Sequence, residues 1–157
     1  MSWTSIWVHV VFATKHRYPF LNDRIRGKIF FHMRENAISK GIQMNVVNGY
    51  KDHAHCLISL GREQSLSKIV QQIKGESSCW INQNKLTKDK FVWQDDYWAA
   101  SVSERHVDRV RRYILNQEAH HTKKTFKEEI NAFAKKNNWP QVNWQDPKEI
   151  NDVSSVD

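Results

Sequence analysis

Two histidines separated by one residue are the feature of this sequence best suited to chemistry. His53 and His55 flank Ala54 in a short apolar segment, residues 53–60. Residues two apart in a β-strand point to the same face, so the imidazoles would lie about 6.5–7 Å apart along it. Imidazole is a frequent metal ligand at neutral pH. The pair indicates either a metal site or two histidines on a half-exposed strand face.

A helix expected over residues 104–120 offers further reactive groups. At about 100° per residue, four of its side chains fall within a sector of about 60°: His106, Val110, Tyr113 and Gln117. Tyr113 and Gln117 are one turn apart, beside an apolar stripe, so the helix can pack while presenting a phenol and an amide. The alternative is that Tyr113 is an amphipathic boundary residue with its hydroxyl in water.

Positive charge gathers on the same helix and across the chain. Arg105, Arg109 and Arg112 form a second stripe, which is either a phosphate-binding ridge or a solvated face with local salt bridges. The chain has 24 Lys and Arg against 17 Asp and Glu, a formal net charge of +7. Such a balance favours a polyanionic partner. Lys15 and Arg17, which follow the first predicted strand, are candidate phosphate contacts.

The hydrophobic pattern predicts the elements that would position these groups. Strands are expected at 4–14, 42–50, 53–60 and 91–102, the last with a turn at 94–96; helices are expected at 23–40, 65–84, 104–120 and from the capping box at 125–128. A βαββαβ run is the ferredoxin-like unit, an α+β fold with two helices on one face of an antiparallel sheet. The other face would be open for function, and the histidine-bearing strand would be central.

Composition bounds the remaining possibilities. The 157 residues suit one compact domain with a short appendage. Apolar runs fall far short of the roughly 20 residues that span a bilayer, and no signal peptide is expected. Two cysteines without a CxxC motif favour a reducing cytosol. His120 and His121 are interpreted as a helix C-terminal pair favoured by the dipole, and the Trp-rich segments as core or dimer contacts.

The motifs together resemble the single-domain tyrosine transposases of the HUH endonuclease superfamily, of the small insertion-sequence and REP-associated types. The specific combination is a histidine–hydrophobic–histidine motif on the third strand together with a Y-I-x-N-Q motif on a helix. The similarity runs from Trp7 to about Glu128. The segments that carry it are Asp52–His55, Ile73–Trp80, Phe91–Tyr97, Val110–Gln117 and His120–His121.

The resemblance implies a mechanism and a set of partners. His53, His55 and Gln117 would bind a divalent metal, Mg²⁺ or Mn²⁺, and Tyr113 would be the nucleophile. A bacterial cytoplasmic homodimer would cleave and rejoin single-stranded DNA at hairpin-marked ends through a 5′-phosphotyrosine. The resemblance leaves open whether the tyrosine acts on its own chain's histidines or on the partner's.

Supporting residues and a domain division accompany this prediction. His9 and His106 are candidates for contacts with the metal ligands, although His9 can also be a simple surface histidine. The transposase domain is expected at 1–121, with a helical extension and flexible tail at 122–157. Two imidazoles suit Mn²⁺ better than Mg²⁺.

Three other classes stay open at this point. A domesticated relative would bind DNA or RNA hairpins without moving DNA. An RNA-recognition module would stack bases on aromatics of its central strands, whereas the third strand here offers His53, His55 and Leu57. A structural zinc protein would rest on Cys56, which is expected to face the core.

Overall fold

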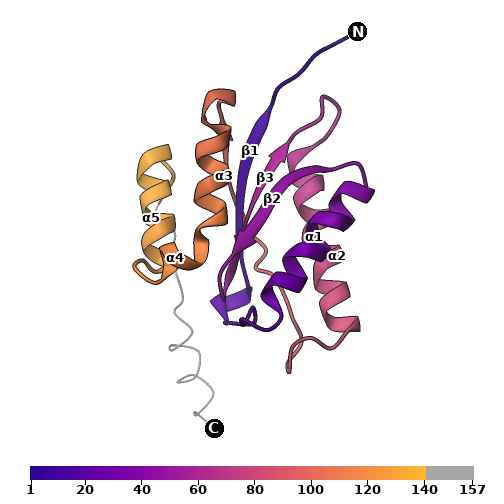
Figure 1. Cartoon of the computed structure of the whole chain (residues 1–157), viewed down its shortest axis with the longest axis vertical. Coiled ribbons are helices and arrows are strands. Elements are labelled where there is room, and N and C mark those ends of the chain that lie inside the picture. Colours follow the sequence, from indigo (N-terminus) through magenta and orange to yellow (C-terminus); the bar gives the residue numbers. More distant parts are fainter. Residues whose placement is uncertain (141–157) are drawn as a thin grey trace.

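The computed structural model describes residues 1–140 as an antiparallel sheet between two layers of helices (Figure 1). Its strands are β1 (Trp7–Ala13), β2 (Gln43–Gly49), β3 (His53–Ser59) and β4 (Trp98–Val102). The order across the sheet is β2-β3-β1-β4. This is the predicted ferredoxin-like α+β fold, and β1 and β3 are central as expected.

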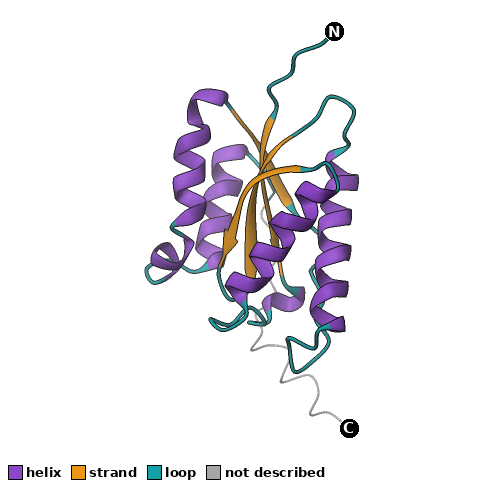
Figure 2. Ribbon diagram, turned by 45° about the vertical axis from the view of Figure 1, so that its right-hand side comes forward, coloured by secondary structure: helices purple, strands orange, loops and turns teal. Residues whose placement is uncertain are grey.

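One face of the sheet packs against α1 (Arg26–Ser39) and α2 (Leu66–Gln83), as predicted (Figure 2). The period of two in the central strands explains this packing, because alternate apolar side chains reach the same side. The buried residues that β1 and β3 contribute here are Val8, Val10, Phe12, Ala54, Cys56 and Ile58. Cys56 therefore faces the core, as expected.

The opposite face, which was expected to be open, is covered by helices. These are α3 (Val107–Leu115), α4 (Gln117–His121) and α5 (Phe126–Asn137). Two apolar clusters hold them there: Val46 and Leu57 with Val107 and Ile114, and Val11, Ala13 and Trp98 with Phe126 and Ile130. The expectation was wrong because this face carries its own apolar side chains, which need a second layer.

The β2 strand departs from the strict alternation predicted for residues 42–50. Its pairing with β3 shifts between Met44 and Val46, a β-bulge that places Met44 among the residues under α1 and α2 but Val46 under α3. As a result Asn48 also faces α3, where its side chain meets the helix backbone.

The helix predicted over residues 104–120 is divided in two. A 3₁₀ turn (Glu104–His106, η2) leads into α3, and a break at Asn116 separates α3 from α4. Asn48 Nδ2 donates to the carbonyl oxygens of Ile114 and Leu115 at 3.1 Å each. In a continuous helix these carbonyls would accept hydrogen bonds from residues four positions later. At the break, the Asn48 side chain therefore donates hydrogen bonds to carbonyl oxygens that a continuous helix would bond to its own backbone.

The strand expected at 91–102 is also shorter than predicted. Only Trp98–Val102 pairs continuously with β1, and the preceding segment meets β1 at a single bridge between Thr14 and Trp93. The strand therefore divides near the turn predicted at 94–96, and its two parts both lie along β1 and do not pair with each other as a hairpin. Trp93 is buried instead, with its Nε1 donating to Ser77 Oγ at 2.8 Å.

The fourth predicted helix is confirmed as α5. Its cap forms as expected, since the Thr125 hydroxyl accepts from the Glu128 amide, and Trp139 packs beside its apolar stripe. The predictions for the tail after residue 140, and for Trp144, lie outside the described residues. Within residues 1–140, no helix combines the length and the apolar character needed to cross a membrane.

Candidate active site

The histidine pair lies at the centre of the sheet, on the face covered by the C-terminal helices. His53 and His55 alternate with Ala54 and Cys56, whose side chains enter the core on the opposite face. Because β3 is bonded to β1 and β2 on its two edges, its backbone is fixed. Both histidine side chains are fully buried. The alternative of a half-exposed surface pair is therefore wrong.

Gly49 permits the close approach of β2 to the first of these histidines. A Cβ built at Gly49 would lie 2.1 Å from the backbone carbonyl oxygen of His53. Any side chain at this position would push the strand away from His53. The glycine therefore supports the position of the site.

A polar partner orients the outer nitrogen of each histidine. His53 Nδ1 is 2.8 Å from Asp52 Oδ1, and His55 Nδ1 is 2.8 Å from His9 Nε2. The Nε2 atoms of both rings are left to face the helices. His9 is itself buried, so it is one of the predicted contacts of the pair and no surface histidine.

Burial keeps two of these imidazoles neutral near pH 7. It lowers the pKa of His55 from 6.5 to about 4, against the opposing effect of the Glu129 carboxylate. It also lowers the pKa of His9 to about 3, with a further contribution from the nearby His55. Neutral imidazole is the form that ligates metals, so His55 is ready to do so.

Tyr113 and Gln117 reach the pair from the end of α3 and the start of α4. Gln117 is fully buried, and its Oε1 lies 3.3 Å from His53 Nε2. The Tyr113 ring centroid is 5.8 Å from that of His55. The structure thus brings together the four predicted residues within one chain, an arrangement that the sequence left open.

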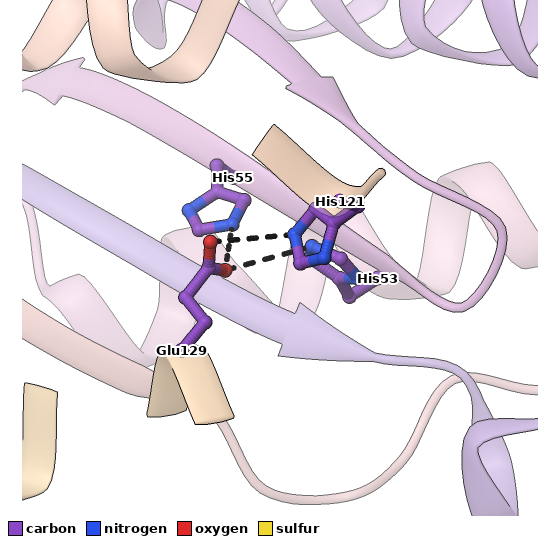
Figure 3. Close-up of side chains that lie close together, drawn as sticks. All are labelled: His53, His55, His121 and Glu129. Atoms are coloured by element: carbon purple, nitrogen blue, oxygen red, sulfur yellow. Dashed lines mark hydrogen bonds and ion pairs between the residues drawn. The ribbon is translucent and has the colours of Figure 1, made fainter. Parts of the chain in front are cut away.

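A carboxylate that the sequence analysis missed completes the cluster. Glu129, on α5, lies with its Oε1 2.7 Å from His55 Nε2 and 3.6 Å from His53 Nε2 (Figure 3). Its other oxygen accepts a hydrogen bond from the Tyr113 hydroxyl. The signal was present: Glu129 is three residues after Phe126 and one before Ile130, at the edge of the apolar stripe, where a charged side chain needs a partner.

The last residues of α4 also point into the cluster. The Nε2 atoms of His120 and His121 lie 2.9 Å and 3.3 Å from Glu129 Oε2, and His121 Nε2 is 2.9 Å from Gln117 Oε1. The interpretation of this pair as a simple helix C-terminus was therefore incomplete. The helix break at Asn116 helps to explain how both can face the site.

Burial and the Glu129 carboxylate both disfavour ionisation of the Tyr113 hydroxyl. Burial raises the pKa of Tyr113 well above its usual value, and the Glu129 charge and hydrogen bond raise it further. Burial works against ionisation of Glu129, but hydrogen bonds from His121 and His55 outweigh it and hold its pKa far below the usual range. In this arrangement the phenol keeps its proton and Glu129 is ionised.

A cavity of about 340 Å³ opens beside the tyrosine, between β4, α3 and α5. Its lining includes His9, His106, Arg109, Tyr113 and Lys136, so it is positively charged and touches the candidate nucleophile. His106, the residue directly before α3, has its Nδ1 2.9 Å from the Ser103 hydroxyl. The cavity therefore places two basic side chains, Arg109 and Lys136, beside the same opening as the phenol.

The remaining predicted basic residues lie at two places. Arg105 and Arg112 are exposed on η2 and α3. Lys15 and Arg17 form the 3₁₀ turn after β1 (Lys15–Arg17, η1), which is tied to the start of β3 because the Thr14 amide donates to the Asp52 carbonyl at 2.8 Å.

The cluster has the composition of a metal site. Ligand atoms of His53, His55, His121 and Glu129 all lie within 4.8 Å of one another. Imidazole nitrogens with a carboxylate oxygen suit divalent transition metals. The residues present therefore fit a divalent ion.

A ferredoxin-like sheet that places a histidine pair opposite a tyrosine-bearing helix is the arrangement expected of the tyrosine transposases that the motifs resemble. The model of the family described as "Transposase IS200 like" matches residues 2–117. The chain therefore belongs to the IS200-like transposases, and the predicted resemblance is confirmed. Membership supports a transposase that cleaves DNA, in a family that is generally metal-dependent.

Individual relatives agree with this assignment. The ISDra2 transposase TnpA of Deinococcus radiodurans is 25% identical over 115 residues, which are 69% of this chain and 81% of that protein. Two solved structures share the fold. A protein described as a transposase of D. radiodurans R1 has a TM-score of 0.60 at 22% identity, over 74% of this chain and 93% of the other. A REP-associated tyrosine transposase bound to a REP hairpin has a TM-score of 0.55 at 16% identity, over 77% and 74%.

Proposed function

We propose that this chain cleaves and rejoins single-stranded DNA at hairpin-marked ends, with Tyr113 as the nucleophile. One observation carries the proposal: Tyr113 and Gln117 meet His53 and His55 inside a single buried cluster. A positively charged cavity leads to the same phenol. The structural neighbour bound to a REP hairpin supports hairpin DNA as the substrate class.

The proposed residue roles follow from the chemistry of the side chains. His53, His55 and Gln117 would hold the divalent ion, which when bound would polarise the scissile phosphate and offset charge on the leaving 3′ oxygen. Tyr113 Oη would form a bond to phosphorus while the bond to the 3′ oxygen breaks. The phenol loses its proton and the 3′ oxygen gains one. The products are a 5′-phosphotyrosine and a free 3′ hydroxyl, so the phosphodiester energy is kept and rejoining needs no ATP.

The surrounding groups would bring the DNA to the tyrosine and expose its hydroxyl. Arg109 and Lys136 in the cavity would pair with phosphates, and the exposed Arg105 and Arg112 would extend that surface. Because the Tyr113 hydroxyl donates to Glu129, the incoming phosphate would have to take the place of that carboxylate. The structure is therefore a resting arrangement of the proposed enzyme.

A covalent adduct tests the proposal. The protein is incubated with Mn²⁺ and single-stranded oligonucleotides from its own genomic flanks, and the products are separated on a denaturing gel. We expect a protein–DNA adduct that is lost in Tyr113→Phe and His55→Ala. Adduct formation by Tyr113→Phe at the normal rate would overturn the mechanism.

The alternative function is a hairpin-binding protein that does not cleave. The engagement of the Tyr113 hydroxyl by Glu129, and its raised pKa, are the observations that favour it. Such a protein would bind hairpin DNA or RNA in a mobility-shift assay and give no adduct with any divalent ion. Equal binding of wild type and Tyr113→Phe, with cleavage by neither, would select this alternative.

We also propose the homodimer that the resemblance implies, with residues 1–121 as the transposase domain and α5 as an extension packed on its sheet. The single-chain site makes a distinct prediction for a dimer: mixing Tyr113→Phe with His55→Ala should not restore cleavage, because no protomer holds a complete site. Recovery of about a quarter of the wild-type rate on mixing would show that the tyrosine acts on the partner's histidines.

A further inference from the structure

Glu129 occupies a position that packing alone does not explain. Its side chain is 2% exposed, yet the other inward residues of α5 are apolar: Phe126, Ile130 and Ala134. A buried carboxylate is costly unless it is paired or binds a cation. Glu129 lies within 3.6 Å of the Nε2 atoms of His53, His55 and His121 (Figure 3). His120 Nε2 is also within this distance, at 2.9 Å.

The hydrogen bonds on the far side of the rings show what Glu129 faces. His53 Nδ1 is held by the Asp52 carboxylate and His121 Nδ1 by the Lys124 carbonyl, each at 2.8 Å. Both partners are acceptors, so Nδ1 donates in each ring, and Nε2, which faces Glu129, is the nitrogen available to a metal ion.

These two Nε2 atoms face oxygen atoms of Gln117 and Glu129. His53 Nε2 and His121 Nε2 lie 3.3 Å and 2.9 Å from Gln117 Oε1, and 3.6 Å and 3.3 Å from the oxygens of Glu129. Nitrogen and oxygen atoms at this spacing are joined either by a hydrogen bond or by a cation that both bind. Holding Nδ1 with an acceptor while Nε2 faces inward is also how proteins orient metal-binding histidines.

The spacing matches that of ligands around one ion. Two donors about 2.1 Å from a tetrahedral ion lie about 3.4 Å apart. The Nε2 atoms of the three histidines that form a metal-binding group with Glu129 lie 2.7 Å (His55), 3.3 Å (His121) and 3.6 Å (His53) from its carboxylate oxygens. The side chains converge from β3, α4 and α5, which are distant in sequence.

We propose that Glu129 and His121 are metal ligands of the DNA-free protein, completing with His53 and His55 the centre on which the proposed function rests. The C-terminal helix α5 is then part of the metal site. Three nitrogens and one carboxylate oxygen suit Mn²⁺ or Zn²⁺ better than Mg²⁺. Glu129 also accepts a hydrogen bond from the Tyr113 hydroxyl. The same carboxylate would therefore bind the metal ion and hold the nucleophilic hydroxyl until DNA binds.

Metal binding without DNA tests this proposal directly. Mn²⁺ is titrated into wild type, Glu129→Gln and Glu128→Gln, and free Mn²⁺ is measured by electron paramagnetic resonance. Glu128 is the matched control, because it is the adjacent residue, loses the same charge and is exposed. We expect Glu129→Gln to weaken Mn²⁺ binding at least tenfold, about the least that losing an outer partner of a ligand costs. Glu128→Gln should bind like wild type.

Limited proteolysis with trypsin is a second measurement, and it reports whether α5 stays packed on the sheet. Lys123 and Lys124 are exposed between α4 and α5 and are sites for trypsin. Mn²⁺ should slow tryptic cleavage there in wild type and in Glu128→Gln, but not in Glu129→Gln. His121→Gln provides an independent variant, expected to lose Mn²⁺ affinity in the same way even if Glu129→Gln folds poorly.

The outcomes separate this inference from the proposed function. Unchanged Mn²⁺ affinity in Glu129→Gln and His121→Gln, with loss in His55→Ala, would overturn the inference and leave the tyrosine mechanism standing. The inference is also overturned, and the tyrosine mechanism stands, if wild type forms the DNA adduct with Mn²⁺ but binds no Mn²⁺ in the absence of DNA. Absence of both the adduct and Mn²⁺ binding in wild type would overturn the proposed function as well.

Discussion

Replacing Asn48 should uncouple the tyrosine helix from the sheet without touching any proposed catalytic group. The Asn48 amide on β2 donates to the carbonyl oxygens of Ile114 and Leu115, the residues directly after Tyr113. Each bond contributes about 0.5–1.5 kcal/mol, so Asn48→Ala should lower the free energy of unfolding by about 1–3 kcal/mol. For a chain of this size the Tm should fall by about 2–12 °C.

The effect on cleavage should exceed the effect on stability. A displacement of about 1 Å in a reacting group can cost about 10²-fold in rate, and Asn48 fixes the segment between Tyr113 and Gln117. We therefore expect adduct formation at 20 °C, where Asn48→Ala remains folded, to slow by about 10²-fold. Asn48→Asp should be worse in both respects, because it presents a carboxylate to two carbonyl oxygens.

Asn45→Ala is the matched control for this experiment. Asn45 is also on β2, and its Oδ1 accepts from Arg111 Nε at 2.7 Å, so its loss removes a contact with an α3 side chain and leaves the helix carbonyls bonded. It should lose stability of about 1 kcal/mol and keep the wild-type rate. Equal rates for Asn48→Ala and Asn45→Ala would refute the positioning role.

Three further predictions follow from the site. Burial lowers the pKa of His55 from 6.5 to about 4, so the unfolded chain binds this proton at a higher pH than the folded chain does. His55 alone should therefore lower the free energy of unfolding by about 3 kcal/mol as the pH falls from 6.5 to 4, and His9, whose pKa is lowered to about 3, adds to the loss; a urea midpoint that stays constant over this range would contradict this prediction. Asp52→Asn, which removes the carboxylate partner of His53, should weaken Mn²⁺ binding by about 10–100-fold in the same titration; wild-type affinity would exclude that role. Gly49→Ala should destabilise the protein and slow adduct formation because of the clash with the strand, whereas Gly75→Ala, which meets no atom within 4 Å on α2, should do neither.

The central part of the fold was predictable because it depends on local alternation. The period of two in β1 and β3 gave the correct core face, since apolar side chains at alternate positions must share one side of a sheet. The bulge in β2 was not predictable, because Met44 and Val46 look alike in a hydrophobic pattern and only their partners across the sheet distinguish them. The break in the tyrosine helix depends on Asn48, which is more than sixty residues away in the sequence.

In the candidate site, too, some residues could be predicted from the sequence and one could not. His53 with His55, and Tyr113 with Gln117, carry recognisable spacing. The resemblance to the tyrosine transposases implied that the two pairs meet, and the structure brings them together. Glu129 carries no spacing signal relative to the histidines, because it reaches them through the fold of α5 over the sheet. The apolar pattern reports which side of a helix is buried; it does not report which polar groups meet there.

The most direct test of the central claim is to map the covalent link by mass spectrometry after digesting the protein and trimming the DNA. The account predicts a nucleotide 5′-phosphate on the peptide that contains Tyr113, with a free 3′ hydroxyl on the released strand. A link to any other residue, or cleaved DNA with no modified peptide, would contradict it.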